Sequence, residues 1–367
     1  MQLKNVLSVF DGISVAQLAL KRAGITYNKY YAAEIDKNAV SVAMKHFPDT
    51  IQLGDVKELT EFRLNKLGLI GNVDLYIGGS PCTSLSCAAG QKESGLEKGQ
   101  SVLFWEYVRI LTIVKPKFFI LENVASMKKA DMDTISKVVG VEPILINSAL
   151  VSAQSRKRLY WTNIQGIIQP ENKGIRLKDI LIDGYTERDK LYCITATIKN
   201  GCEQDYLLKS SRQMVYINPA VIVSINEKGI KKVIEMKPLN EPIQIGYINK
   251  NRQGEKIYHI NGKSITLTAS NAGKYMIADD NMIEITPETM KGRLRKLYPI
   301  ECERLQTLPD DYTAGFSNST RYKMLGNSFT ADVMSHILSF IPANSVSKRV
   351  NFNTINEHKY IGLWGVI

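Results

Sequence analysis

The chain has 367 residues, with 47 Lys or Arg against 36 Asp or Glu, so its formal net charge is +11. A hydrophobic fraction of 44% and a charged fraction of 23% are typical of a globular protein and exclude a disordered or collagen-like chain. The apolar runs fall short of the ~18 residues that cross a bilayer, and the first residues lack a signal peptide's apolar core, so we expect a cytoplasmic protein with no membrane partner.

The first 165 residues or so alternate between strand and helix patterns. Strands are predicted at 6–10, 30–33, 75–77, 118–121 and 144–150. Helices are predicted from 15 up to Gly24, at 37–46 and at 103–114. The first strand is followed by a turn containing Gly12, and the second ends at Glu34. This order is typical of a nucleotide-binding α/β unit, and it predicts a parallel sheet with helices on both faces.

The pattern changes near Gly166 to short β-branched segments separated by Gly, Asn and Pro, which predicts a smaller, strand-rich domain. Residues 151–300 contain 24 basic and 15 acidic side chains and nine of the 17 tyrosines. This excess favours contact with a polyanion, and a solvated basic face is the alternative. Helical periodicity returns at 300–305 and at about 328–341.

A ligand site is predicted around residues 10–14, Glu34 and Asp55. A glycine after a strand lets the backbone approach a ligand, and an acid at the end of the second strand can accept two ribose hydroxyls. The chain has no G-x-G-x-x-G segment, so a nucleoside without phosphates fits better than a dinucleotide. A plain tight turn is the alternative.

Residues 78–82 (GGSPC) place Cys82 on a rigid loop just after a buried strand, where open α/β sheets carry their chemistry. This setting favours a nucleophile over a structural cysteine, whereas Cys87 has no such setting. The five cysteines include no C-x-x-C pair and only four histidines accompany them, so neither a disulfide framework nor a metal site is predicted.

Two more segments carry candidate catalytic groups. Glu122 directly follows the strand 118–121, where an acid can protonate a ring nitrogen, and a helix N-cap is the alternative. Alternation along a strand would place Gln154, Arg156 and Arg158 on one face, where the arginines need anions or carbonyl oxygens as partners. A basic strand on the surface is the alternative reading.

In this order, these segments resemble the C5-cytosine DNA methyltransferase family. The Pro-Cys loop, the Glu-Asn-Val triplet and the Gln-x-Arg-x-Arg segment are that family's central motifs, and residues 295–309 and 325–328 match its closing motifs. The resemblance covers residues 5 to about 340. It implies a Rossmann-like α/β fold, the S-adenosylmethionine-dependent methyltransferase sheet, with a smaller target-recognition domain.

The resemblance also implies domain boundaries. We expect residues 1–168 to form the catalytic and cofactor-binding domain, 169–292 the target-recognition domain, 293–343 a return to the catalytic domain and 344–367 a tail. The chain would act on double-stranded DNA as a monomer, inside a bacterial or phage-infected cell, with a restriction endonuclease of the same system as a candidate partner.

The implied reaction is methylation of C5 of a flipped-out cytosine. Cys82 would add to C6, Glu122 would protonate N3, Arg158 would bind O2 and Arg156 would support the pair. At Ile35 the family often has Trp, so an aliphatic side chain would replace a stacking contact to the adenine. The positions implied to bind S-adenosylmethionine are Phe10, Gly12, Ile13, Glu34, Ile35, Asp55, Val56, Pro81, Leu103, Asn327 and Ser328.

Three other functions are alternatives. A sibling branch of the fold methylates tRNA, but its Pro-Pro-Cys and Cys-Phe-Thr signatures are absent from this sequence. An inactive DNA-binding regulator would have lost Cys82 or Glu122, and a small-molecule dehydrogenase would need phosphate-binding glycines. The sequence therefore favours an enzyme that methylates DNA.

Overall fold

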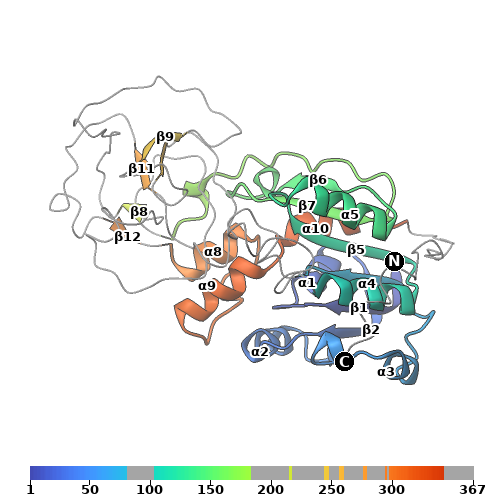
Figure 1. Ribbon diagram of the computed structural model, residues 1–367. Coiled ribbons are helices and arrows are strands. Elements are labelled where there is room, and N and C mark those ends of the chain that lie inside the picture. Colours follow the sequence, from blue (N-terminus) through green and yellow to red (C-terminus); the bar gives the residue numbers. More distant parts are fainter. Residues whose placement is uncertain are drawn as a thin grey trace.

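The computed structural model describes residues 1–80, 103–182 and 297–342, together with the backbone of five short strands between 183 and 296 (Figure 1). Two of these strands pair with each other, in the order β12-β8, and three form a sheet in the order β11-β10-β9. Their bounds are β8 (Val215–Tyr216), β9 (Gln244–Tyr247), β10 (Lys256–His259), β11 (Met276–Ala278) and β12 (Leu294–Arg295). The predicted boundaries of the target-recognition domain stay a prediction.

A seven-stranded sheet in the order β3-β2-β1-β4-β5-β7-β6 forms the centre of the described part. The strands are β1 (Gln2–Val9), β2 (Thr26–Ala33), β3 (Ile51–Gln52), β4 (Leu75–Gly78), β5 (Phe118–Val124), β6 (Ile144–Asn147) and β7 (Lys157–Thr162). Pairing is parallel from β3 to β5, whereas β7 is antiparallel to both β5 and β6. The prediction of a purely parallel sheet is wrong at β7, because residues 148–156 are too few for the crossover that a parallel neighbour needs.

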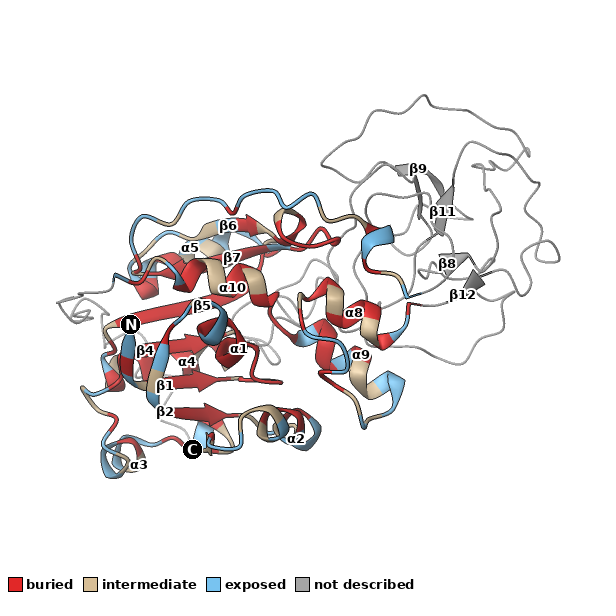
Figure 2. Ribbon diagram, turned by 180° about the vertical axis from the view of Figure 1, so that it is seen from behind, coloured by how far each residue is buried: buried red, intermediate tan, exposed pale blue. Residues whose placement is uncertain are grey.

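Helices cover both faces of this sheet. The helices of the described residues are α1 (Val15–Arg22), α2 (Lys37–His46), α3 (Glu61–Lys66), α4 (Leu103–Val114), α5 (Lys129–Val139), α8 (Pro299–Leu305), α9 (Asn318–Asn327) and α10 (Ala331–Leu338). One hydrophobic cluster joins α1, α2 and α10 to one face, and a second joins α3, α4 and α5 to the other. The central strands are buried almost throughout (Figure 2) because both of their faces are covered.

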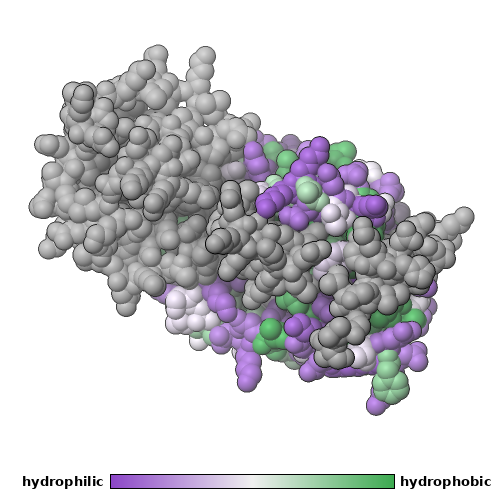
Figure 3. Space-filling view, viewed as in Figure 1, coloured by the Kyte–Doolittle hydropathy of each residue, from purple (hydrophilic) through white to green (hydrophobic). Residues whose placement is uncertain are grey.

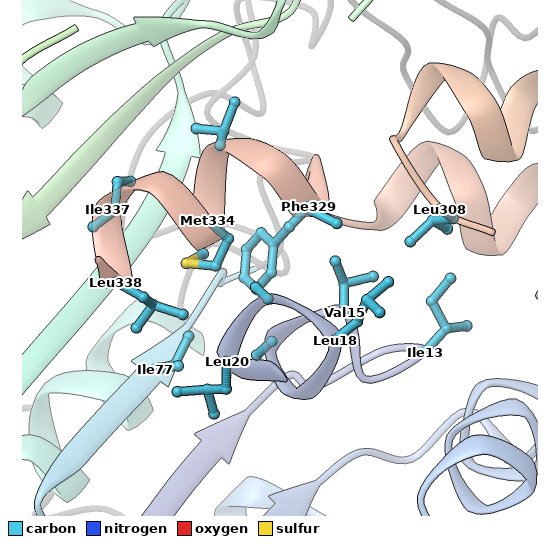
Figure 4. Packing of buried hydrophobic residues seen from close by; sticks show 14 of the residues in the cluster. Ile13, Val15, Leu18, Leu20, Ile77, Leu308, Phe329, Met334, Ile337 and Leu338 are labelled. Carbon is cyan, nitrogen blue, oxygen red and sulfur yellow. The ribbon is translucent and has the colours of Figure 1, made fainter. Parts of the chain in front are cut away.

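The packing of α1 against α10 brings the two ends of the described chain together. Val15, Leu18 and Leu20 of α1 belong to the same cluster as Met334 and Leu338 of α10 (Figure 4). The segment after residue 296 thus completes the covering of the sheet face on which α1 and α2 lie.

The visible surface of the described part is mainly hydrophilic in Figure 3. Within that part, no helix is long and apolar enough to span a bilayer.

Several predicted elements match the structure, and others differ. The helices α2 and α4 have the predicted bounds, and β5 continues through Val124, so Glu122 lies in a strand and not at a helix N-cap. The strand β7 begins only at Lys157, and α10 is shorter than the predicted 328–341. Helix α9 was not predicted, because its sequence NSTRYKMLGN has almost no apolar face.

Candidate functional site

The carboxyl ends of four parallel strands meet at one edge of the sheet. Val9 pairs with Ala33 of β2 on one side and with Gly78 of β4 on the other, and Gly78 pairs in turn with Leu121 of β5. The chain connections diverge at this point, since β2 lies on one side of β1 and β4 on the other. Open α/β sheets bind their ligands at such a switch point.

The loop after β1, residues 10–14, has an unusual backbone. Phe10, Gly12 and Ser14 all adopt left-handed conformations, with φ of 56°, 58° and 60°. Side chains rarely tolerate this region, and it persists where surrounding contacts fix it. Gly12 has a further feature: a Cβ added to it would meet nothing within 4 Å, so the space above the loop is open.

Buried hydrogen bonds of the Asp11 carboxylate fix this loop. The carboxylate accepts a hydrogen bond from the Tyr30 hydroxyl at 2.7 Å and another from the Ser14 hydroxyl at 2.6 Å. The Gln17 side chain then donates to both Ser14 and Thr50, each at 2.8 Å. Burial raises the pKa of Asp11, and these hydrogen bonds lower it by less. Asp11 lies within the predicted segment 10–14, but the sequence analysis assigned it no role of its own.

The Glu34 carboxylate binds the backbone of this loop. One carboxylate oxygen accepts the Gly12 N–H at 2.9 Å, and the other accepts the N–H groups of Ile35 and Asp36, both at 2.8 Å. Three backbone donors therefore hold the carboxylate beside the open space. The Ile35 side chain is 69% exposed, which is unusual for a large aliphatic residue and leaves an apolar surface next to Glu34.

The structure describes most of the other predicted cofactor positions. Phe10, Val56 and Leu103 belong to one hydrophobic cluster, and Asp55 caps the short helix η1 (Val56–Glu58) by accepting the Lys57 N–H at 2.9 Å. Asn327 and Ser328 lie at the carboxyl end of α9. Pro81 lies outside the described residues. An open space, a fixed carboxylate and an exposed aliphatic side chain fit the sugar and base of a nucleoside cofactor.

A buried ion pair lies at the adjoining strand end. Arg158 Nε is 2.8 Å from Glu122 Oε1, and these residues are 6% and 9% exposed. A Cβ added to Gly79 would lie 3.2 Å from Glu122 Oε2 and 2.9 Å from Phe329 Cε1, so only glycine fits there. The backbone at Gly79 is therefore close to Glu122, while the prediction that residues 78–82 present Cys82 at this strand end stays a prediction. Cys82 and Cys87 lie outside the described residues.

Gln154 and Arg156, just before β7, bond to the segment after residue 296 (the returning segment), whereas Arg158 of β7 pairs with Glu122. Arg156 donates to the backbone oxygens of Gly326, at 3.4 Å, and Ser328, at 2.8 Å. Gln154 donates to the backbone oxygen of Leu305 at 2.6 Å. The prediction of one strand face carrying Gln154, Arg156 and Arg158 is wrong, because residues 154–156 precede β7 and bond to the returning segment. The alternative of a surface strand is also wrong, since both arginines are buried.

Comparison with known proteins places the chain among methyltransferases. A family model described as "C-5 cytosine-specific DNA methylase" matches residues 4–342. The chain is 26% identical to the orphan methyltransferase M.SPRI of Bacillus phage SPR, over 94% of this chain and 98% of that protein. It is 25% identical to the type II methyltransferase M.HhaI of Haemophilus parahaemolyticus, over 94% of this chain and 95% of that protein.

Solved structures share the fold. The Entamoeba histolytica methyltransferase EhMeth superposes with a TM-score of 0.59 at 17% identity, covering 93% of this chain and 98% of that one. The S. pombe Dnmt2 methyltransferase gives a TM-score of 0.54 at 17% identity, covering 92% and 97%. The α/β sheet predicted from the sequence is therefore that of these methyltransferases.

Proposed function

Because the chain belongs to the C-5 cytosine-specific DNA methylase family, we propose that Cys82, Glu122 and Arg158 carry out the reaction on the cytosine ring. The protein is a DNA (cytosine-5-)-methyltransferase that uses S-adenosylmethionine. The observation that supports the assignment is the buried Glu122–Arg158 pair at the edge of the sheet where residues 10–14 and Glu34 form the cofactor corner.

The chemistry requires such a pair. C5 of cytosine is a poor nucleophile, and addition of the Cys82 thiolate to C6 makes C5 electron-rich by forming a C6–S bond. Negative charge then builds at N3 and O2. Glu122 would donate a proton to N3, and the Arg158 guanidinium would hydrogen-bond to O2. Loss of the C5 proton to solvent restores the C5–C6 double bond, the sulfur leaves with its electron pair, and N3 returns its proton to Glu122.

Arg156 acts differently in this proposal. Its guanidinium bonds to backbone oxygens of Gly326 and Ser328, so it would position the returning segment and not touch the base. This departs from the sequence-based expectation that Arg156 supports the Glu122–Arg158 pair.

S-adenosylmethionine, when bound, supplies the electrophilic methyl group. Glu34 would accept hydrogen bonds from the ribose, Ile35 would lie against the adenine, and the Gly12–Ile13 backbone would line the cofactor. Phe10, Val56 and Leu103 would form the apolar wall. Asp55, Pro81, Asn327 and Ser328 complete the proposed set.

The substrate cytosine must leave the helix, because C6 cannot be reached inside a duplex. Residues 169–292, with 18 basic and 15 acidic side chains, would read the target sequence and place basic side chains on the phosphates. Exchange of this segment for that of another family member tests the assignment. A folded, active chimera should take the donor's target site, and one that keeps the original site contradicts it.

We further propose that the protein works as a monomer on DNA in the cytoplasm of a bacterial or phage-infected cell. The relatives from a phage and a bacterium support the setting. One relative is named an orphan methyltransferase and the other a type II methyltransferase, so a partner restriction endonuclease is a hypothesis for this chain.

The test of the covalent step is a DNA duplex with 5-fluorocytosine at the target, which traps the adduct because fluorine cannot leave as a cation. The wild-type protein and Cys87→Ser should form an adduct that survives denaturant and requires S-adenosylmethionine, whereas Cys82→Ser should form none. An adduct in Cys82→Ser but not in Cys87→Ser would show that the nucleophile is the other cysteine. An adduct formed with RNA but not with DNA would favour the tRNA-methylating branch.

A further inference from the structure

Tyr312 reaches the cofactor loop from the far end of the sequence. It lies between α8 and α9, in the segment that returns to the sheet, and its side chain is buried. Its hydroxyl donates a hydrogen bond to the backbone oxygen of Ile13 at 2.9 Å. Burial raises the pKa of Tyr312, so the hydroxyl keeps its proton and stays a donor.

The ring of Tyr312 is itself fixed by His46, the last residue of α2. The two rings stack with centroids 4.0 Å apart and planes 5° from parallel. His46 Nε2 also forms a hydrogen bond with the backbone oxygen of Tyr312, at 2.7 Å. Both the side chain and the backbone of Tyr312 are therefore held against α2.

The peptide that Tyr312 holds is the strained one. Ile13 lies between Gly12 and Ser14, both left-handed, and a left-handed residue other than glycine costs about 1–2 kcal/mol. Such a conformation persists only where several contacts fix it. Asp11 and Glu34 fix the loop through Ser14 and the Gly12 N–H, and Tyr312 fixes the carbonyl between them.

We propose that Tyr312 is a positioning residue for S-adenosylmethionine: it holds the Ile13 peptide so that the loop keeps its binding conformation before the cofactor arrives. This inference rests on the proposed function, because it takes residues 10–14 as the cofactor loop. It also means that Tyr312, a residue of the segment following residue 296, acts on the cofactor site without touching the cofactor.

The variant Tyr312→Phe keeps the ring and its stacking on His46 and removes only the hydroxyl. Tyr322→Phe is the matched control, because its hydroxyl is also buried in the returning segment but donates to the backbone oxygen of Leu297. Binding of S-adenosylhomocysteine by calorimetry should weaken by about 3- to 10-fold in Tyr312→Phe, the usual effect of one lost hydrogen bond. In Tyr322→Phe the affinity for S-adenosylhomocysteine should stay within about 2-fold of the wild-type value.

A second readout separates positioning from general damage. In Tyr312→Phe the KM for the cofactor should rise while the KM for DNA stays unchanged, and added S-adenosylhomocysteine should raise the melting temperature less than in wild type. Equal binding by Tyr312→Phe and wild type, or equal weakening in both variants, overturns the inference and leaves the proposed function intact. Failure of the wild-type chain to bind the cofactor overturns both.

Discussion

The Asn123 side chain donates a hydrogen bond to the Ser80 hydroxyl, 3.2 Å away, and both residues are buried. Asn123 lies in β5 and Ser80 lies two residues after β4, so the bond joins the end of one strand to the loop after its neighbour. It also fixes Ser80, the last described residue before Pro81 and Cys82, against the strand that carries Glu122. We expect this contact to influence how Cys82, two residues further on, is placed relative to Glu122.

Replacement of Asn123 by Ala should lower kcat by about 10- to 100-fold, because small displacements of reacting groups have effects of this size. Asn163→Ala is the control, since Asn163 binds the opposite end of β5 through the Phe119 N–H and the Lys117 backbone oxygen. Single-turnover methylation measures the difference. Equal losses in the two variants would mean that only the stability of β5 matters.

Arg158→Met should destabilise the protein by about 3–5 kcal/mol, because it leaves the Glu122 carboxylate buried without its cation. Lys173→Met is the comparison: Lys173 lies 2.7 Å from Asp332, but half of its side chain is exposed, and such pairs contribute about 0–1 kcal/mol. Urea denaturation gives both free energies of unfolding. A loss in Arg158→Met no larger than that in Lys173→Met would contradict the structure.

Glu122→Gln should slow adduct formation with 5-fluorocytosine DNA by about 10²- to 10⁴-fold, the range for a lost general acid. An amide is nearly the same size, so affinity for unmodified DNA should change little. Rapid-quench trapping with excess enzyme measures the rate. An unchanged rate would remove Glu122 from the mechanism.

Two acids near the cofactor corner should affect stability in opposite pH ranges. Burial raises the pKa of Asp11 above 3.8, whereas the hydrogen bond from Lys323 lowers that of Asp36 below 3.8. The contribution of Asp11 is present below pH 3.8 and is lost as the pH rises through its folded pKa. That of Asp36 is present above pH 3.8 and is lost as the pH falls through its folded pKa.

The free energy of unfolding should therefore be measured against pH for Asp11→Asn and Asp36→Asn. Relative to Asp11→Asn, the wild-type protein should lose stability on going from acid toward neutral pH. Relative to Asp36→Asn, the wild-type protein should gain stability as the pH rises through the acid range. The same direction in both comparisons would contradict these assignments.

The sequence predicted the first half of the fold well because its signals are local. The bounds of α2 and α4 follow from apolar spacing and from residues near their ends. The reversal of β7 was missed, since no local pattern records the direction of a strand. The same is true of α9, whose stability comes from contacts and not from an apolar stripe.

The site was predicted in part for the same reason. Residue types after strand ends indicated Glu34 and Glu122, both of which lie at the expected edge. The partners of Arg156 and Ile13, in contrast, come from more than 150 residues away along the chain. Contacts of this kind depend on the tertiary fold, and no spacing in the sequence encodes them.

The packing of α1 on α10 has a consequence for synthesis of the chain. Helix α1 is complete at Arg22, but α10, which covers the same face, begins only at Ala331. On the ribosome, the apolar side of α1 lacks its partner α10 until about 300 further residues have been synthesised, at roughly 5–20 residues per second. For tens of seconds the nascent chain presents an uncovered hydrophobic face, which is the kind of surface that molecular chaperones bind.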